Sequence, residues 1–271
     1  MTDFTFIVFD LDGTLLTSDF QLLPETINAI NQIRELGYRI TVATGRSYKS
    51  ARAFLDRLDI TEPMVFSNGA VFDNPESGER EIIAGIPLES ALIVLMLLPD
   101  FQISAKLHLA GGELYKTDDT PWPDEGKYFE VGEIKSNLKA ELKEDPIKIV
   151  FFAKSDRIDD FFKRLEEILG KKSTVRSFRS HTNYVEMTHN RVSKGDAVRR
   201  LIKGLGLDPT EIITVGDHEN DYEMLRDFGL GVVAGPGTKK LLGVSAYQIP
   251  RPEERGIEML YKWLKKGCPL K

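Results

Sequence analysis

The two ends of this sequence share one pattern, in which short apolar strands alternate with amphipathic helices, and this pattern constrains the fold most strongly. Phe4 to Phe9 is an almost continuous run of aromatic and β-branched residues, which is typical of a strand buried on both faces of a parallel sheet. A helix is expected over 24–37, between proline and glycine boundary residues, and a second strand over 39–43. The alternation returns near the C-terminal end, with a strand expected over 212–215. We therefore predict an α/β fold with a doubly wound parallel sheet.

Apolar spacing predicts which side of the first helix is buried. In the segment 24–37, the inner stripe is expected to contain Ile27, Ile30, Ile33 and Leu36. Residues at intervals of three and four lie on one side of a helix, so this side should pack on the sheet.

The pattern changes in the middle of the chain, where hairpin signals replace the alternation of strand and helix. Gly111-Gly112 stands between two apolar segments, which indicates a β-hairpin, and 156–169 has the spacing of an amphipathic helix. We interpret residues 82–186 as an inserted α+β cap domain. Residues 1–81 and 187–271 then form a Rossmann-like core from both ends of the chain, and both parts have the usual size of a domain.

Composition and charge argue against several classes of protein. Of the 271 residues, 41% are hydrophobic, and the formal net charge of −6 does not suit a nucleic-acid binder, whose surface would be basic. The longest apolar run, Ala91 to Leu98, is much shorter than the roughly 20 residues that span a bilayer. No basic stretch precedes the first apolar run, and the single cysteine, Cys268, cannot form an internal disulfide. These features predict a cytoplasmic protein that binds neither nucleic acid nor membranes.

Polar residues follow three of the expected strands, at the edge where open parallel sheets bind ligands. The three segments are Asp10-Leu11-Asp12-Gly13-Thr14, Thr44-Gly45-Arg46, and Gly216-Asp217-His218-Glu219-Asn220-Asp221. If the three strands are neighbours in the sheet, these segments face a common crevice.

The carboxylates of these segments form a candidate site for a divalent cation. Asp10 and Asp12 are two residues apart, so an extended chain points both to the same side, where they repel unless they share a cation or a proton. The alternative for this segment is an ordinary acidic turn. Asp217 is suited to a metal, whereas Asp221 falls in the first turn of a helix, where capping alone is the alternative. Oxygen ligands favour Mg²⁺, and the four scattered histidines offer no zinc site.

Other residues suit a bound anion. Thr44 and Gly45 offer a hydroxyl and a backbone amide near a helix start, with helix capping as the alternative. Lys194 opens a helix, where the dipole disfavours a cation unless an anion faces it. Arg46 either contacts a substrate or forms a structural ion pair. The sequence contains no P-loop, no dinucleotide-binding glycine motif and no nucleophile elbow.

In their order and spacing, these segments resemble the motifs of the haloacid dehalogenase superfamily of phosphatases. The four motifs are Asp10-Leu11-Asp12-Gly13-Thr14-Leu15, Thr44-Gly45-Arg46, Lys194, and Gly216-Asp217 with Asn220-Asp221. The Ser67-Asn68-Gly69-Ala70 segment, together with an insertion between the second and third motifs, is similar to the Cof-type subgroup, whose members carry a large α/β cap at that point.

This resemblance implies a role for each matching residue. Asp10 resembles the nucleophile that accepts the phosphoryl group as an aspartyl-phosphate, and Asp12 resembles the general acid and base. Mg²⁺ would be held by the Asp10 carboxylate, the Asp12 backbone carbonyl and the Asp217 carboxylate, with Asp221 orienting these ligands from outside the coordination sphere. The implied phosphate-binding positions are the Leu11 amide, Thr44, Gly45, Lys194 and Asn220.

We therefore expect a Mg²⁺-dependent phosphatase that acts on small phosphorylated metabolites, sugar phosphates among the candidates, with specificity supplied by the cap. Two alternatives stay open. One is a phosphomutase of the same superfamily, which returns the phosphoryl group to the substrate. The other is a phospho-ligand-binding or regulatory protein without turnover, against which the presence of Asp10, Asp12, Lys194 and Asp217 argues. The sequence is compatible with a monomer and does not identify the substrate.

Overall fold

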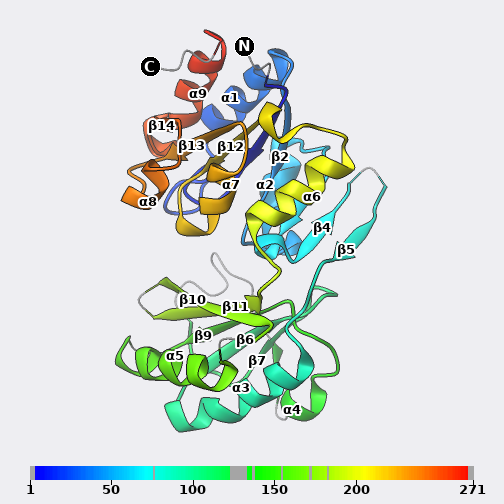
Figure 1. Cartoon of the computed structure of the whole chain (residues 1–271), viewed down its shortest axis with the longest axis vertical. Coiled ribbons are helices and arrows are strands. Elements are labelled where there is room, and N and C mark those ends of the chain that lie inside the picture. Colours follow the sequence, from blue (N-terminus) through cyan, green and yellow to red (C-terminus); the bar gives the residue numbers. More distant parts are fainter. Residues whose placement is uncertain are drawn as a thin grey trace. The chain divides into compact units, whose positions relative to one another are not determined.

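The structure is a computed structural model that describes residues 4–75, 77–122, 133–135, 138–153, 155–170, 173–181 and 183–267. The chain forms two compact units (Figure 1). The first contains Met1–Glu81 and Ser193–Lys271, and the second contains Ile82–Val192. The second unit extends to Val192, and the last strand of its sheet ends at His189. The predicted α/β class with a parallel sheet is confirmed.

The first unit is built on five parallel strands in the order β14-β13-β12-β1-β2. Their bounds are Phe6–Phe9 (β1), Arg39–Val42 (β2), Ile212–Gly216 (β12), Leu230–Ala234 (β13) and Tyr247–Ile249 (β14). Phe6 in β1 lies opposite Arg39 on one side and opposite Ile212 on the other. All four residues of β1 are buried, as expected for a central strand of a parallel sheet.

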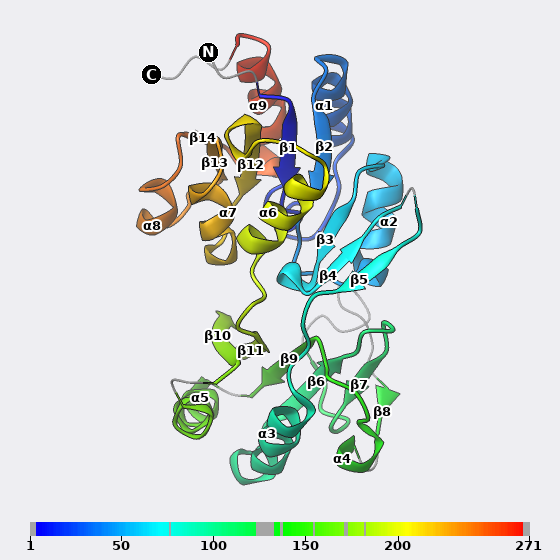
Figure 2. The same cartoon turned by 45° about the vertical axis from the view of Figure 1, so that its right-hand side comes forward.

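Helices cover both faces of this sheet (Figure 2). They are α1 (Pro24–Glu35), α2 (Tyr48–Leu58), α6 (Lys194–Gly204), α7 (Tyr222–Arg226), α8 (Lys239–Leu242) and α9 (Gly256–Leu264). The apolar sides of α6 and α7 pack with Phe6 and Val8 of β1 in one buried cluster, and α1 packs beside α9. A sheet covered on both sides by helices is what the continuous apolar strand predicts.

The predicted inner stripe of α1 is partly wrong. Ile30 and Ile33 are buried, but Leu36 is 39% exposed and Ile27 is only half-buried. The buried face instead includes Thr26 and Ala29. Leu36 follows the last helical residue, at a terminus that turns away through Gly37 at a φ of 97°. A prediction based only on large apolar residues misses the small residue and the hydroxylated residue that this face also buries.

A small sheet lies beside β2 in the first unit. It has the order β3-β4-β5, with bounds Met64–Phe66, Val71–Asp73 and Arg80–Ile82. Ala43, directly after β2, forms a parallel bridge with Val65 of β3. The Thr44 amide donates to the Val65 carbonyl at 2.9 Å, so β3 fixes the course of the chain just after β2.

The second unit is a six-stranded sheet with two long helices on one face. The strand order is β10-β11-β9-β6-β7-β8. The strands are Ser104–His108 (β6), Leu114–Lys116 (β7), Glu133–Ile134 (β8), Lys148–Phe152 (β9), Val175–His181 (β10) and Tyr184–His189 (β11), and the helices are α3 (Leu88–Phe101), α4 (Leu138–Glu141) and α5 (Ser155–Leu169). Ile149 and Phe151 of β9 pack with Phe161 of α5 in the buried core. The predicted hairpin around Gly111-Gly112 is confirmed as the antiparallel pair β6 and β7.

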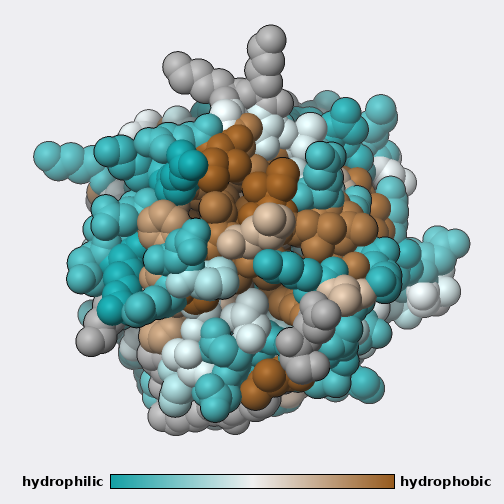
Figure 3. Space-filling model, turned by 90° about the horizontal axis from the view of Figure 1, so that it is seen from below, coloured by the Kyte–Doolittle hydropathy of each residue, from teal (hydrophilic) through white to brown (hydrophobic). Residues whose placement is uncertain are grey.

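The outer side of α3 is unusually apolar for a helix at the surface. On this side Ile93 is 38% exposed and Met96 is 63% exposed. Figure 3 shows apolar side chains gathered on the face seen from below.

Among the described residues, no helix is both long enough and apolar enough to cross a membrane.

Candidate functional site

Three neighbouring strands of the first unit end at the candidate site. β1 lies between β2 and β12, and these three strands lead into the Asp10, Thr44 and Asp217 segments respectively. From β1 the chain goes on to β2, whereas from β12 it goes on to β13 in the opposite direction. The boundary between β1 and β12 is therefore a topological switch point, where open α/β sheets form a crevice beyond the strand ends. The condition for a shared crevice is met.

Lys194 joins two of the predicted carboxylates. The Ser193 side chain caps α6, and Lys194 is the first residue of that helix. Its Nζ atom lies 2.6 Å from Asp10 Oδ1 and 2.7 Å from Asp221 Oδ1. All three residues are buried. The structure therefore supplies the anions that a lysine at a helix start needs, and both come from distant parts of the sequence.

Burial perturbs both members of the Lys194–Asp10 pair. Desolvation raises the pKa of Asp10 well above its ordinary value, and the nearby carboxylates of Asp221 and Asp217 raise it further, against the opposing attraction of Lys194. Burial acts to lower the pKa of Lys194, but the attraction of Asp10 and Asp221 outweighs it and raises that pKa. Lys194 is thus held as a cation. Its single positive charge does not balance the negative charges of Asp10, Asp217 and Asp221.

Both carboxylate oxygens of Asp221 have partners. Oδ1 accepts from Lys194, and Oδ2 accepts from the backbone amides of Asp217 at 3.0 Å and His218 at 3.1 Å. The fully buried Asp221 side chain therefore fixes both the lysine and the loop that carries Asp217. These contacts to backbone amides agree with the capping alternative, and the position of Asp221 beside a metal stays a prediction.

Among the carboxylates of the site, Asp217 has an oxygen without a hydrogen-bond partner. Its Oδ1 atom is buried and accepts no hydrogen bond. Burial, with repulsion from Asp221 as the next largest cause, raises the pKa of Asp217 to about 7. The carboxylate also lies against the backbone of Gly13, where an added Cβ would be 2.2 Å from Asp217 Oδ2. Gly13, at a φ of 76°, is therefore required both by the turn and by the close approach of Asp217.

These acidic groups fit a divalent cation. One oxygen from each of Asp10, Asp217 and Asp221 lies within 4.8 Å of the others. An all-oxygen donor set with an orphaned carboxylate atom suits Mg²⁺. A cation here would satisfy Asp217 and offset the repulsion that raises its pKa.

Asp12 differs from Asp10 and Asp221 in its basic partner. Its carboxylate is bound by the Arg46 guanidinium, at 2.7 Å for the closest pair of atoms, rather than by Lys194. The two carboxylates of the first motif therefore have different basic partners, Lys194 for Asp10 and Arg46 for Asp12. Whether both residues also contact one Mg²⁺, Asp12 through its backbone carbonyl, stays a prediction. Of the two sequence alternatives for Arg46, the structure shows the ion pair.

The predicted phosphate-binding residues border the same strand ends. Thr44 is buried, and its Oγ1 atom accepts from the Arg46 amide at 3.1 Å. The Leu11 carbonyl accepts from the amides of Thr14, Leu15 and Leu16, which fixes the loop around the Leu11 amide. The role of these groups in holding phosphate stays a prediction.

Asn68 belongs to this site, although sequence reasoning used it only as a mark of the subgroup. Its Oδ1 atom accepts from Asn220 Nδ2 at 3.0 Å and lies 3.0 Å from where a Cβ on Gly45 would be. Asn68 is buried at a φ of 57°, between Ser67 and Gly69, which also have positive φ. Such backbone conformations concentrate at functional sites. The Asn-Gly pair one residue after a strand was the available sequence signal.

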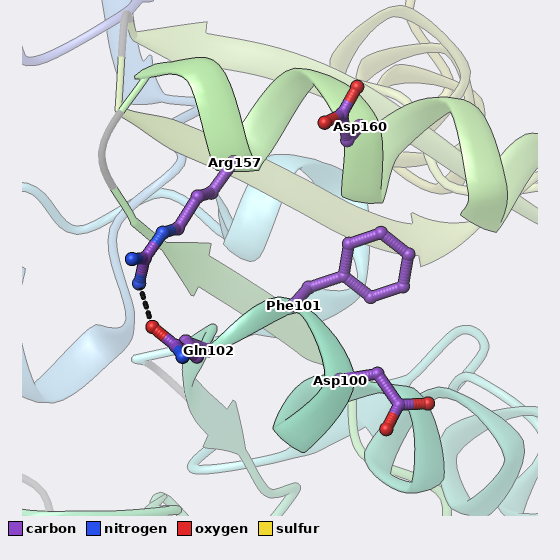
Figure 4. A pocket seen from close by; sticks show the side chains of 5 residues that line it. All are labelled: Asp100, Phe101, Gln102, Arg157 and Asp160. Carbon is purple, nitrogen blue, oxygen red and sulfur yellow. Dashed lines mark hydrogen bonds between the residues drawn. The ribbon is translucent and has the colours of Figure 1, made fainter.

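A hollow at the surface of the second unit contains none of the predicted site residues. Asp100, Phe101 and Gln102 at the end of α3 line it together with Arg157 and Asp160 of α5 (Figure 4). Arg157 donates a hydrogen bond to the Gln102 side chain across it. We assign this hollow no part in the chemistry of the carboxylate site.

Comparisons with known proteins show what this chain is similar to. A family model described as haloacid dehalogenase-like hydrolase matches residues 7–260. A 5-amino-6-(5-phospho-D-ribitylamino)uracil phosphatase of Bacillus subtilis is 24% identical over 94% of this chain and 96% of its own length. An HMP-PP phosphatase of Yersinia pestis is 28% identical over 94% of both chains. A solved haloacid dehalogenase-like hydrolase from Bacteroides thetaiotaomicron has the same fold, with a TM-score of 0.86 at 20% identity, over 97% of this chain and all of that one.

Proposed function

Because this chain belongs to the haloacid dehalogenase-like hydrolase family, we propose that its phosphatase reaction depends on Mg²⁺ and proceeds through an aspartyl-phosphate on Asp10. The observation that carries the proposal is the buried contact between Lys194 and Asp10, beside the orphaned oxygen of Asp217. A carboxylate is a poor nucleophile toward a phosphate dianion, because like charges repel. A lysine and a divalent cation at the same point reduce that repulsion.

The first step transfers the phosphoryl group to the protein. A carboxylate oxygen of Asp10 forms a bond to phosphorus, and the bond between phosphorus and the leaving-group oxygen breaks. The electron pair of that bond stays on the leaving oxygen, which takes a proton from the Asp12 carboxyl group. The alcohol departs, and Asp12 is left as a carboxylate.

The second step releases phosphate. Asp12 takes a proton from a water molecule whose oxygen forms a bond to phosphorus. The bond between phosphorus and Asp10 breaks, its electron pair returns to the Asp10 carboxylate, and inorganic phosphate leaves. Asp12 is again protonated, so the two steps restore the starting state.

The surrounding residues hold the phosphoryl group and its charge. Mg²⁺, held by Asp10, the Asp12 carbonyl and Asp217, would supply charge stabilisation for the transferring group. Lys194 contributes a fixed positive charge that is already buried and needs little reorganisation. Thr44, Gly45 and Asn220, with the Leu11 amide, are the groups that we propose bind the phosphate oxygens.

Small phosphorylated metabolites are the proposed substrates, with sugar phosphates among the candidates. Two relatives carry names that refer to phosphorylated small molecules, a ribitylamino-uracil phosphate and HMP-PP. We propose that the inserted unit supplies the specificity for the substrate. A phosphomutase would use the same first step but would return the phosphoryl group to an alcohol instead of water.

The test is phosphate release from a panel of phosphate monoesters in the presence of Mg²⁺, with Asp10→Asn as control. The proposal expects phosphate to appear with at least one small ester and to fall to background in the variant. Isomerised phosphorylated product without free phosphate would indicate the mutase. Tight binding of a phosphorylated ligand without turnover would indicate the binding protein.

A further inference from the structure

Arg46 binds the carboxylate of Asp12, the proposed general acid and base. Its Nε atom lies 3.0 and 2.9 Å from the two carboxylate oxygens of Asp12, and its Nη2 atom lies 2.7 Å from Oδ1. These contacts engage both oxygens of one carboxylate with the edge of the planar guanidinium group. Such a geometry fixes orientation as well as charge, which a lysine would not do.

The guanidinium group is itself held in place by aromatic rings. Its Cζ atom lies 5.1 Å from the centre of the Phe20 ring and 5.2 Å from that of Phe54, over the face of both. Phe20 has a φ of 60°, which is unusual for a bulky residue and points to a structural requirement for its position. Arg46 is thus supported by two rings from different parts of the chain.

Exposure distinguishes the two members of the pair. The Arg46 side chain is 8% exposed, whereas that of Asp12 is 36% exposed. The arginine therefore holds the carboxylate from the buried side and leaves Asp12 accessible from solvent. A side chain that must exchange protons with a substrate and with water needs this combination of fixed orientation and access.

The two cations of the site divide its carboxylates between them. Lys194 binds Asp10 and Asp221, and Arg46 binds Asp12. Without Arg46, the Asp12 carboxylate would be attracted toward the positive charge that the nucleophile and the metal site need. It would then be held as one more ligand rather than kept for proton transfer.

We propose that Arg46 is a positioning residue, which acts through Asp12 by holding its carboxylate for proton transfer rather than by contacting the substrate. The inference rests on the proposed function, because it requires Asp12 to be the general acid and base. It also explains why an arginine, with a planar donor edge, follows Thr44 and Gly45.

The test is a double-mutant cycle between Arg46 and Asp12, with kcat and KM measured on an alkyl and an aryl phosphate. Arg46→Met keeps an apolar chain beside the two rings and removes the hydrogen bonds. It should lower kcat for the alkyl ester by about 10- to 100-fold, as for other residues that orient a catalytic group, and change KM by less than about 3-fold. In the Asp12→Asn background the same substitution should cost less than about 3-fold.

Arg39 offers a matched control in the first unit. It binds Glu62 through Nε and Nη2, both at 2.7 Å, and lies over the Phe6 ring at 5.2 Å, away from the carboxylates of the site. Arg39→Met should leave kcat unchanged on both esters. Thermal unfolding of each variant separates lost stability from lost positioning. If Arg46→Met does not fold, Arg46→Lys keeps the charge without the planar donor edge and enters the same cycle.

The outcomes separate this inference from the proposed function. Equal losses from Arg46→Met in both backgrounds, or a loss confined to KM, would overturn the positioning role while leaving the phosphatase mechanism in place. Undiminished turnover of the alkyl ester by Asp12→Asn would instead overturn the acid and base role on which the inference depends. A coupled loss in kcat, largest for the alkyl ester, supports it.

Discussion

The Nζ atom of Lys194 lies 2.6 Å from Asp10 Oδ1, and the two residues are 184 positions apart in the sequence. This contact joins the first strand of the sheet to the start of α6 inside the first unit. It also places the positive charge of the site at the proposed nucleophile. The cluster that surrounds it contains more carboxylates than basic groups, which is the electrostatic reason for expecting a bound cation.

Replacing Lys194 should therefore remove activity. Lys194→Met leaves Asp10 and Asp221 without their buried partner, and we expect kcat to fall by at least about 100-fold, as when a fixed charge-stabilising donor is lost. Loss of one member of a buried ion pair also costs about 3 to 5 kcal/mol of stability unless protonation relieves it. Lys203→Met, at an exposed position of the same helix, is the control and should change neither kcat nor stability appreciably. Retention of normal kcat by Lys194→Met would contradict this assignment.

The two carboxylates of the first motif should respond differently to the leaving group. Asp12→Asn removes proton transfer, an effect of about 100- to 10,000-fold on an alkyl ester. The loss should be smaller for p-nitrophenyl phosphate, whose leaving group needs little protonation. The kcat/KM on each ester measures the difference, because it reports the steps up to phosphoryl transfer and not the later release of phosphate. Equal impairment on the two would mean that Asp12 is not the acid.

The close approach of Asp217 to Gly13 can be tested with a second glycine of similar conformation. Gly13→Ala would place a Cβ 2.2 Å from Asp217 Oδ2, whereas Gly206, at a φ of 69°, has nothing within 4 Å of the equivalent point. Both substitutions add the strain of a left-handed alanine, about 1 to 2 kcal/mol. Only Gly13→Ala should also remove phosphatase activity and the stabilisation by Mg²⁺. Kinetics and thermal unfolding of the two variants check this. Equal activity in both would show that the close approach of Asp217 to Gly13 is not needed for activity.

The raised pKa of Asp217 predicts how stability depends on pH in the metal-free protein. Burial raises this pKa to about 7, above the value of about 3.9 in an unfolded chain. Between these values the folded state binds more protons than the unfolded state, so the free energy of unfolding falls as the pH rises from about 4 to about 7. Removing the charge should therefore stabilise the metal-free protein above this range.

Asp217→Asn provides the measurement. Without metal, the variant should unfold at a higher temperature than the wild type near pH 8, and the two should converge near pH 4, roughly the unfolded pKa. Mg²⁺ should raise the unfolding temperature of the wild type more than that of the variant. Asp56→Asn, whose side chain is 68% exposed, is the control and should show neither effect. A wild type that is insensitive to Mg²⁺ would count against Asp217 as a ligand.

The position of the site could be predicted from the sequence because the reason for it is local. A continuous apolar strand that ends in polar residues and glycine implies a parallel sheet, and the carboxyl ends of such strands lie at one edge. The prediction assumed only that the three strands are adjacent in the sheet, and β1 does lie between β2 and β12. The position of Lys194 at a helix start predicted only that an anion faces it, and the structure shows that Asp10 and Asp221 do so.

The partners of individual side chains could not be predicted, because they depend on tertiary packing. The sequence left two alternatives for Arg46, a substrate contact and an ion pair. Only the fold brings it to Asp12, which lies 34 positions away in the sequence. Asn68 was passed over because its amide matters only once Asn220 lies beside it. The face of α1 was partly misassigned because Thr26 and Ala29 are buried by their neighbours rather than by their own hydrophobicity.

The central claim, a covalent intermediate on Asp10, is tested most directly by mass spectrometry of Asp12→Asn protein mixed with p-nitrophenyl phosphate and Mg²⁺ and quenched in acid. The aryl leaving group lets the first step proceed, and loss of the base slows the second, so the phosphorylated protein should accumulate. The account predicts one phosphoryl group per chain, carried by the peptide that contains Asp10, and none when Asp10→Asn is combined with Asp12→Asn. Turnover without any labelled protein, or a label on a different residue, would contradict it.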